Sequence, residues 1–291
     1  MKQLQKVLRS VLFAPCDRLK IMEKSINLQT DVVIFDLEDS VHPMKKNDAR
    51  RELCSFIEAI HHKKIRPSIA VRINCCHTTP WGKDDASIIS SLPIDAIVIP
   101  KVDSLDSLNE TMNNFKQNNN KPIWAMIESC KGVINCETIA TSEHIEAIVL
   151  GGNDLTKDMK AKFSQDRKHL LYSMSKCVTA ARSAGKYVID AVFMDIKNVE
   201  GLKVDCELGR EYGFDGKSLI HPDQIDICNN IFSPSQEELH YANKVIAAWN
   251  KAMEEGKSVA VLDGKLIEYL HVHEANAIIK TATIIENNKN L

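Results

Sequence analysis

Short apolar runs rich in valine and isoleucine recur along the chain, and each is followed by a longer segment with apolar residues at helical spacing. Eight such runs predict β-strands, over 9–15, 31–39, 68–74, 96–102, 122–129, 147–154, 187–193 and 216–222. The segments between them are long enough for a helix each, as in KNDARRELCSFIEAI. Nearly continuous apolar strands that alternate with helices indicate an α/β protein with a parallel sheet covered on both faces.

Such a sheet has two possible closures, an open doubly wound sheet and an eight-stranded (β/α)8 TIM barrel. Eight strand–helix units within residues 1–230 suit the barrel, because such barrels typically take about 250 residues. No glycine-rich phosphate-binding fingerprint follows the first predicted strand, which disfavours an open dinucleotide-binding fold. We therefore predict a TIM barrel.

Residues 231–291 break this rhythm and predict a C-terminal extension. Ser235 and Glu238 form a capping-box pattern that begins a helix, and Gly256 ends it. The segment SVAVLDGKLIEYL predicts a hairpin with Asp263 and Gly264 at its turn. A further helical segment follows the hairpin.

The composition is that of an ordinary globular protein, with 44% hydrophobic and 26% charged residues and a formal net charge of -2. This balance indicates neither a nucleic-acid nor a membrane-surface partner, and no apolar run approaches the roughly 18 residues of a spanning helix. The nine cysteines form no CxxC pair, which argues against a zinc site or a disulfide framework. Scattered thiols favour a reducing compartment, so we expect a cytoplasmic protein.

Charged or polar side chains lie at nearly every predicted strand end. The C-terminal strand ends of a TIM barrel form its active-site rim, so these side chains should converge. They are Asp36, Glu38, Asp39, Arg72, Asn74, Lys101, Glu128, Asn153, Asp154, Asp190 and His221. Carboxylates that converge on one rim repel each other unless a cation lies among them.

Hard oxygen ligands without a cluster of histidine or cysteine suit Mg²⁺, which usually takes one or two protein carboxylates. We predict Glu128 and Asp154 as these ligands, because they end neighbouring strands. The acids of DLED (36–39) then either hold metal-bound water or orient Arg72 and Lys101, and the sequence leaves both roles open. Lys101 itself is either a ligand contact or an ion-pair partner of the rim acids.

Seven segments, in the same order along the chain, carry a resemblance to a known family. They are RSVLFAPCDR, DVVIFDLEDSVHPMKKNDAR, VRIN, IPKV, MIESCKG, GGNDL and GFDGKSLIHPDQI. The chain resembles the citrate lyase β-subunit-like family of the HpcH/HpaI aldolase and malyl-CoA lyase superfamily. This resemblance implies a TIM barrel whose C-terminal extension packs on a neighbouring subunit, in a homotrimer or hexamer.

The resemblance also implies roles for individual residues. Glu128 and Asp154 match the residues that hold Mg²⁺, and Arg72 matches the arginine that contacts the substrate carbonyl region. The backbone of GGND, with Gly152 and Asn153, matches the cradle for the carboxylate of a keto acid. The CoA-binding side of relatives is matched by Phe13, Pro15, Arg18, Lys46 and Arg50. Asp190 is a candidate substrate contact or a structural cap.

The implied reaction is cleavage, or formation, of the carbon–carbon bond of a 3-hydroxyacyl-CoA such as citryl-, malyl- or citramalyl-CoA. Its products are acetyl-CoA and a keto acid (oxaloacetate, glyoxylate or pyruvate). Mg²⁺ would act as Lewis acid and template for the acid half, and Arg72, which stays protonated, would be the positive partner of the enolate. Asp36 and Glu38 are the candidates for the general base.

Three positions depart from the family pattern. Cys16 replaces the glycine of FxPG, where CoA approaches closely, and Asn198 replaces an acidic residue. Glu268 stands where relatives have an aspartate that reaches the site from the next subunit, and a shift of about one bond can cost roughly a hundredfold in rate. Two alternatives therefore stay open, a malyl-CoA thioesterase-like hydrolase and a non-catalytic subunit that binds CoA or keto acid. A carrier-protein partner also stays open.

Overall fold

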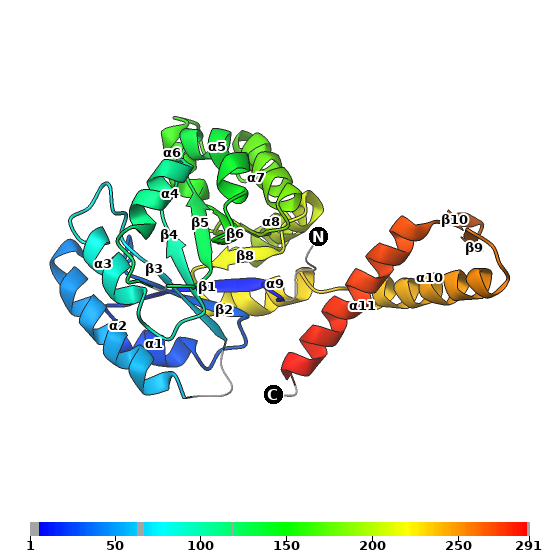
Figure 1. Cartoon of the computed structure of the whole chain (residues 1–291), viewed down its shortest axis with the longest axis horizontal. Coiled ribbons are helices and arrows are strands. Elements are labelled where there is room, and N and C mark those ends of the chain that lie inside the picture. Colours follow the sequence, from blue (N-terminus) through cyan, green and yellow to red (C-terminus); the bar gives the residue numbers. More distant parts are fainter. Residues whose placement is uncertain (1–5, 63–66, 118, 290–291) are drawn as a thin grey trace. The chain divides into compact units, whose positions relative to one another are not determined.

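The computed structural model describes residues 6–62, 67–117 and 119–289. Eight parallel strands pair in chain order and close into a barrel, because β8 also pairs with β1 (Figure 1). The strands are β1 (Ser10–Pro15), β2 (Val32–Asp36), β3 (Ser68–Arg72), β4 (Ala96–Ile99), β5 (Ile123–Ile127), β6 (Ile145–Leu150), β7 (Tyr187–Asp190) and β8 (Gly216–Leu219). The TIM-barrel prediction is confirmed, and the open sheet is excluded.

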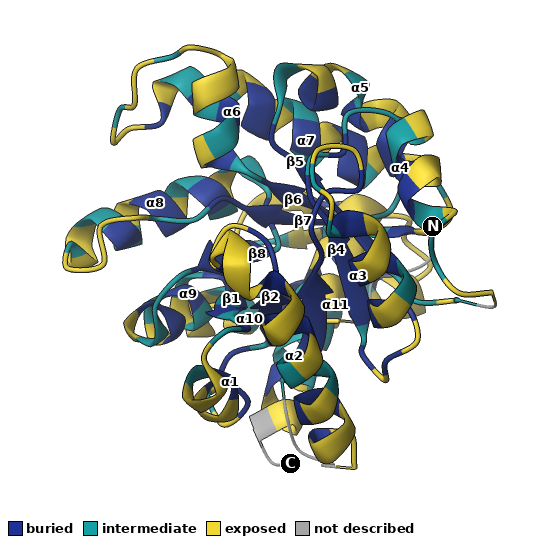
Figure 2. Ribbon diagram, turned by 90° about the vertical axis from the view of Figure 1, so that its left-hand side faces the viewer, coloured by how far each residue is buried: buried dark blue, intermediate teal, exposed yellow. Residues whose placement is uncertain are grey.

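Helices follow the strands and surround the barrel. They are α1 (Leu19–Ser25), α2 (Lys46–Ile60), α3 (Gly82–Ile89), α4 (Leu105–Met112), α5 (Cys130–Ala140), α6 (Gly152–Asp158), α7 (Leu171–Ser183), α8 (Val199–Tyr212) and α9 (Ile225–Ile231). In Figure 2 the strands are dark blue, whereas the helices are buried on one side and exposed on the other. Throughout the described ranges, every helix is too short or too polar for a membrane span.

Alternation along the strands decides which side chains face the inside of the barrel, because successive residues point to opposite faces. The inner core contains alternate residues of the strands β1 to β7, among them Val11, Ile34, Ala70, Met126 and Ile189. Arg72 lies two residues after Ala70 in β3, and Glu128 lies two residues after Met126. Both residues therefore continue the inner face of the barrel. The barrel interior therefore leads from an apolar core to a charged rim.

Asp190 follows the inward-facing Ile189 and lies on the outer face, where it is completely buried. It accepts hydrogen bonds from Arg167 at 2.7 Å and from Lys217 at 2.9 Å. Both cations also pair with Asp205 of α8, at 2.7 and 2.5 Å. Burial alone would raise the pKa of Asp190, but Lys217 and Arg167 lower it. Asp190 therefore belongs to a buried ion cluster between barrel and helix, and its predicted role as a substrate contact or structural cap stays a prediction.

Seven of the eight strands end earlier than the sequence pattern predicts, whereas β1 ends at Pro15 as predicted. β2 ends at Asp36 because its carboxylate accepts hydrogen bonds from the backbone N–H groups of Glu38 (2.9 Å) and Ser40 (3.1 Å) and turns the chain out of the sheet. β6 ends at Leu150, and residues 152–154, which were predicted to be strand, form the first turn of α6. Asp36, Arg72 and Asp190 are thus the last residues of their strands, and the other predicted polar residues lie beyond the strand ends.

Residues Ile231–Leu291 form a second compact unit, divided from the first at the boundary that the sequence predicts. Its helix α10 (Gln236–Glu254) begins at the predicted capping box, with both hydrogen bonds between Ser235 and Glu238 present. Strands β9 (Ala260–Leu262) and β10 (Lys265–Ile267) form the predicted hairpin, and Asp263 and Gly264 both have positive φ. Helix α11 (Tyr269–Lys289) follows. Packing of this unit on a neighbouring subunit stays a prediction.

We expect Lys217→Met to lower the free energy of unfolding by about 3 kcal/mol, because the buried carboxylates of Asp190 and Asp205 would then share Arg167 alone. Lys203→Met is the control, since Lys203 pairs with Glu200 at 2.7 Å on the surface and should cost less than about 1 kcal/mol. Urea denaturation followed by circular dichroism measures both. Equal losses for the two variants would contradict a stabilising role for the cluster.

Candidate functional site

An ion pair joins the ends of two neighbouring strands, Asp36 on β2 and Arg72 on β3. Nε and Nη2 of Arg72 donate to the two carboxylate oxygens of Asp36, each at 2.7 Å. Burial alone would raise the pKa of Asp36, but Arg72 and the N–H groups of the following turn lower it to about 2. Burial would lower the pKa of Arg72, and the charge of Asp36 instead raises it. Both groups are therefore ionised and fixed in place.

The remaining guanidinium nitrogen of Arg72, Nη1, meets further acids. It lies 3.1 Å from Oε2 of Glu38 and 3.8 Å from Oδ2 of Asp39. The ring of Phe13 covers the guanidinium, with its centroid 4.9 Å from Cζ, at a distance that suits a cation–π contact. Phe13, which was predicted on the CoA side, thus also helps to position Arg72.

Glu128 follows β5 and is almost completely buried. Its Oε1 accepts a hydrogen bond from the backbone N–H of Lys101 at 2.7 Å. Burial, followed by repulsion from Glu38, raises the pKa of Glu128 to about 8. A Cβ atom at Gly151 would lie 2.4 Å from Cβ and 2.7 Å from Oε2 of Glu128, so only glycine leaves room for this carboxylate.

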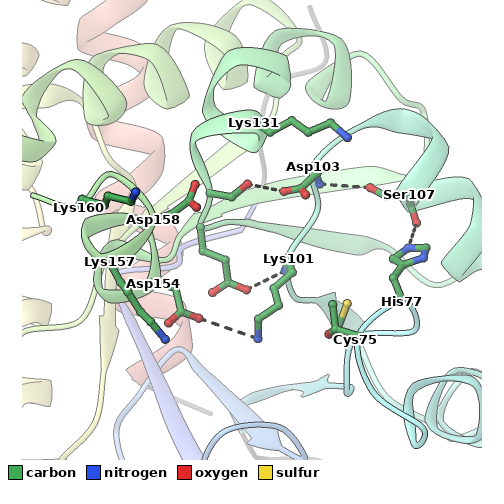
Figure 3. Close-up of a pocket in the computed structure, with 13 residues that line it drawn as sticks. Cys75, His77, Lys101, Asp103, Ser107, Lys131, Asp154, Lys157, Asp158 and Lys160 are labelled. Carbon is green, nitrogen blue, oxygen red and sulfur yellow. Dashed lines mark hydrogen bonds and ion pairs between the residues drawn. The ribbon is translucent and has the colours of Figure 1, made fainter.

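Lys101 connects the acids of the rim. Its ammonium group pairs with Glu38 and lies 3.9 Å from Oδ2 of Asp154 (Figure 3). Burial would lower the pKa of Lys101, but the charge of Glu38 raises it instead. The pKa of Glu38 itself is raised, chiefly by burial. The acids at 36 and 38 therefore orient Arg72 and Lys101, which is one of the two roles that the sequence left open.

Two adjacent hollows open at this rim and share Glu128 and Asp154. The smaller hollow, of about 340 Å³, is lined by Phe13, Asp36, Asp39, Ser40, Arg72, Met126, Glu128, Leu150, Gly151, Gly152, Asn153, Asp154, Val192, Met194, Ser218 and Ile220. The larger hollow, of about 620 Å³, lies toward α4, α5 and α6 and carries the side chains labelled in Figure 3. A ligand in either hollow would meet the same two carboxylates.

The rim residues fit a hard divalent cation. The side chains at the strand ends include five acids, Asp36, Glu38, Asp39, Glu128 and Asp154, beside Arg72 and Lys101, and Lys131, Lys157 and Lys160 also line the larger hollow. Burial, followed by the charge of Glu38, raises the pKa of Glu128, and Gly151 leaves room for its carboxyl group. Glu128 and Asp154 offer oxygen donors of the kind that suits Mg²⁺; within the described ranges no three His, Cys, Asp or Glu side chains gather as a metal cage. Ligation by Glu128 and Asp154 stays a prediction.

Lys46 and Arg50 of α2 are engaged with the protein itself. All three donors of the Lys46 ammonium group are used, on the carbonyl oxygens of Leu37 (2.7 Å) and Glu38 (2.6 Å) and on Oδ1 of Asn74 (2.8 Å). Lys46 thus holds the DLED turn in place, and its predicted contact with CoA stays a prediction. Arg50 donates to Asp85 at 2.5 Å and borders a separate hollow on α2, so its CoA role stays a prediction.

The other residues that were predicted to contact substrate, CoA or a neighbouring subunit differ in burial and position. Pro15 is partly buried at the end of β1, and Arg18 is exposed at the start of α1. Gly152 and Asn153 begin α6 and line the smaller hollow. Glu268, directly before α11, belongs to the second unit and is exposed, so its place in a neighbour's site stays a prediction.

Two of the departures from the family pattern have a structural explanation. Cys16 is buried, and its backbone N–H donates to the carbonyl oxygen of Asp36 at 3.1 Å. Burial raises the pKa of its thiol well above the ordinary value, which disfavours the nucleophilic thiolate form. Asn198 caps α8 by accepting a hydrogen bond from the N–H of Gly201 at 2.9 Å.

The sequence pattern missed several residues of the two hollows. Ser218 lines the smaller hollow, and Lys131, Lys157 and Lys160 line the larger one. Alternation along β8 could have indicated Ser218, because it lies two residues from Gly216 on the same face. The three lysines lie on helices and a turn, where no strand periodicity points to them.

The family described as HpcH/HpaI aldolase/citrate lyase matches residues 9–222. A (3S)-malyl-CoA thioesterase of Cereibacter sphaeroides is 39% identical over 278 residues, with 95% of each chain covered. The citrate lyase subunit beta of Escherichia coli is 32% identical, with 95% of this chain and 93% of that protein covered. The structure of CitE from Mycobacterium tuberculosis with magnesium, acetoacetate and coenzyme A aligns with a TM-score of 0.77 at 25% identity, over 96% of this chain and 100% of that chain. The chain therefore belongs to the HpcH/HpaI aldolase/citrate lyase family.

Proposed function

We propose that the protein is a Mg²⁺-dependent carbon–carbon lyase that cleaves or forms a 3-hydroxyacyl-CoA such as citryl-, malyl- or citramalyl-CoA. The observation that carries this proposal is the placement of Glu128 and Asp154 beside a fixed, permanently charged Arg72 in one hollow. The relatives support it, since one is a citrate lyase subunit and another binds magnesium, acetoacetate and coenzyme A. The products would be acetyl-CoA and a keto acid.

Mg²⁺, when bound by Glu128 and Asp154, would supply a Lewis acid for the oxygens of the acid half. Arg72 would stabilise the enolate oxygen of the acetyl half, because it stays charged and its position is fixed before the substrate binds. Lys101 pairs with Glu38 and so offsets the negative charge that raises the pKa of Glu128. The chain thus arranges its positive charge before the reaction begins.

Asp36 is not suited to the general-base role that the sequence left open. Both of its oxygens accept hydrogen bonds from Arg72, and a pKa of about 2 means that it takes up no proton near neutral pH. Of the two predicted candidates, only Glu38 combines a raised pKa with an oxygen, Oε2, that accepts no hydrogen bond. We propose Asp36 as the residue that positions Arg72 and Glu38 as the base.

A thioester hydrolase on the same site is the second candidate function. The (3S)-malyl-CoA thioesterase relative favours it, and Glu268 would supply a carboxylate from a neighbouring subunit. We also propose a cytoplasmic homotrimer or hexamer, in which the second unit of one chain covers the site of the next. The nine cysteines, all free, are compatible with a reducing compartment.

The products of malyl-CoA, citramalyl-CoA and citryl-CoA, identified by mass spectrometry, test the reaction. With Mg²⁺ we expect acetyl-CoA and a keto acid from at least one ester, and with EDTA we expect neither. Free CoA together with the intact hydroxy acid would establish the hydrolase instead. If no ester is turned over, the catalytic proposal fails in favour of a binding subunit or a carrier-bound substrate.

We expect Glu128→Gln and Asp154→Asn each to weaken Mg²⁺ binding at least tenfold, because each removes a charged oxygen ligand. Asp158→Asn is the matched control, since Asp158 lines the same larger hollow but accepts a hydrogen bond from the backbone of Cys130 at 2.7 Å. Isothermal titration calorimetry with Mg²⁺ alone measures all three. An unchanged affinity in both ligand variants would rule out this pair.

Asp36→Asn should destabilise the protein in a pH-dependent way. The folded-state pKa of about 2 lies below the ordinary value of 3.8, so the ionised carboxylate stabilises the fold above about pH 4 and loses this effect as the pH falls toward 2. The difference in unfolding free energy between wild type and Asp36→Asn should therefore shrink by about 2 kcal/mol between pH 5 and pH 2. Asp39→Asn, which alters an exposed partner of Arg72 at 3.8 Å, should show little such change. A difference independent of pH would contradict the ion pair.

A further inference from the structure

Ser218 has a buried hydroxyl group without a partner. The residue is 1% exposed, and its Oγ neither donates nor accepts a hydrogen bond. Three other buried polar atoms among the described residues share this property, but each lies near an opposite charge, namely Oδ1 of Asp17 (3.8 Å), Oε2 of Glu38 (3.1 Å) and Nε of Arg167 (2.7 Å). Ser218 has no such neighbour. A buried hydroxyl without a hydrogen bond lowers the stability of the folded protein. Its presence here therefore points to a ligand that supplies the missing hydrogen-bond partner.

The hydroxyl belongs to the wall of the smaller hollow. Ser218 pairs in the β-ladder with Val11, which faces the inside of the barrel, whereas the preceding Lys217 reaches outward to Asp190. Alternation therefore places the Ser218 side chain on the inner face, and it lines the hollow there together with Ile220. This wall forms part of the same hollow as Arg72, Glu128 and Asp154.

Apolar side chains form much of the wall of the smaller hollow. Leu150, Val192, Met194 and Ile220 line it together with Phe13 and Met126, and Ser40 and Asn153 line it as further uncharged polar residues. The apolar side chains accommodate a hydrogen atom or a methyl group on the bound acid, and Ser218 supplies a hydroxyl without a partner for an oxygen of that acid. A carboxymethyl group, with its own charge, would be desolvated against them.

Among the described residues that line the smaller hollow, Arg72 is the single basic one, and three acids already surround its guanidinium group. Lys131, Lys157 and Lys160 line the larger hollow and not the smaller one (Figure 3). A ligand with two carboxylates would therefore have to extend out of the smaller hollow to find a cation.

From these observations we infer that the smaller hollow selects a short 2-oxo acid with a single carboxylate, of the glyoxylate or pyruvate type, and that the Ser218 hydroxyl hydrogen-bonds to its oxygen atoms. This inference rests on the proposed function and specifies the keto acid of the reaction. The CoA ester would be of the malyl or citramalyl type rather than the citryl type. Ser218 is then a residue that determines specificity in the reaction.

Calorimetric titration of the full-length protein with glyoxylate, pyruvate and freshly dissolved oxaloacetate, each with Mg²⁺, tests the inference. We expect pyruvate or glyoxylate to bind at least tenfold more tightly than oxaloacetate. Ser218→Ala should weaken the preferred acid about five- to tenfold, the effect of one lost hydrogen bond. Ser218→Thr, which keeps the hydroxyl, should restore most of the affinity, and the affinity of Ser218→Ala for Mg²⁺ alone should be unchanged.

Oxaloacetate that binds as tightly as pyruvate would overturn the inference, and so would an unchanged affinity of Ser218→Ala for the preferred acid. Lys131→Ala provides a further check, because it should affect none of the three acids. A selective loss of oxaloacetate binding in Lys131→Ala would show that a second carboxylate reaches the larger hollow, again against the inference. Since these titrations need no turnover, selective binding without cleavage of any ester would refute the lyase and leave the selectivity standing.

Discussion

The ion pair between Asp36 and Arg72 sets the charge of the whole rim. It consumes both oxygens of the aspartate and fixes the guanidinium, so Arg72 has only one nitrogen left for Glu38 and Asp39. Lys101 neutralises Glu38. Glu128 and Asp154, which both line the smaller hollow, remain as the two carboxyl groups that we propose as metal ligands. A divalent cation bound there would supply positive charge between them.

The repeating strand–helix architecture was predictable because it depends on local patterns of apolar and polar residues. Alternating strands and helices gave the barrel, and the residues at Ser235, Asp263 and Gly264 gave the helix start and the hairpin turn of the second unit. The exact strand ends were not predictable in this way. They depend on side-chain bonds such as those of Asp36 to its own turn, and no propensity scale contains such bonds.

The charged residues of the candidate site were predicted from the sequence, but most of the residues that line its two hollows were not. Arg72, Glu128 and Asp154 come together as expected, since the ends of parallel strands converge on one rim. The hydrogen bonds of Asp190 and Lys46 to other residues of the protein were not predictable, because position at a strand end or in a motif does not say which way a side chain points. Ser218 was missed because a small polar residue within a strand is unremarkable until the surrounding bonds are known. Its missing partner, rather than its type, distinguishes it.

The contact between Gly151 and Glu128, which we propose as a metal ligand, bears on how relatives of this chain could diverge. Any side chain there would occupy the space of the Glu128 carboxylate, so the two positions are free to change only together. A descendant that loses the glutamate would also lose the constraint on its neighbour, and a larger residue could then fill the gap. We expect such paired replacement among family members that keep the barrel fold but no longer bind a metal ion.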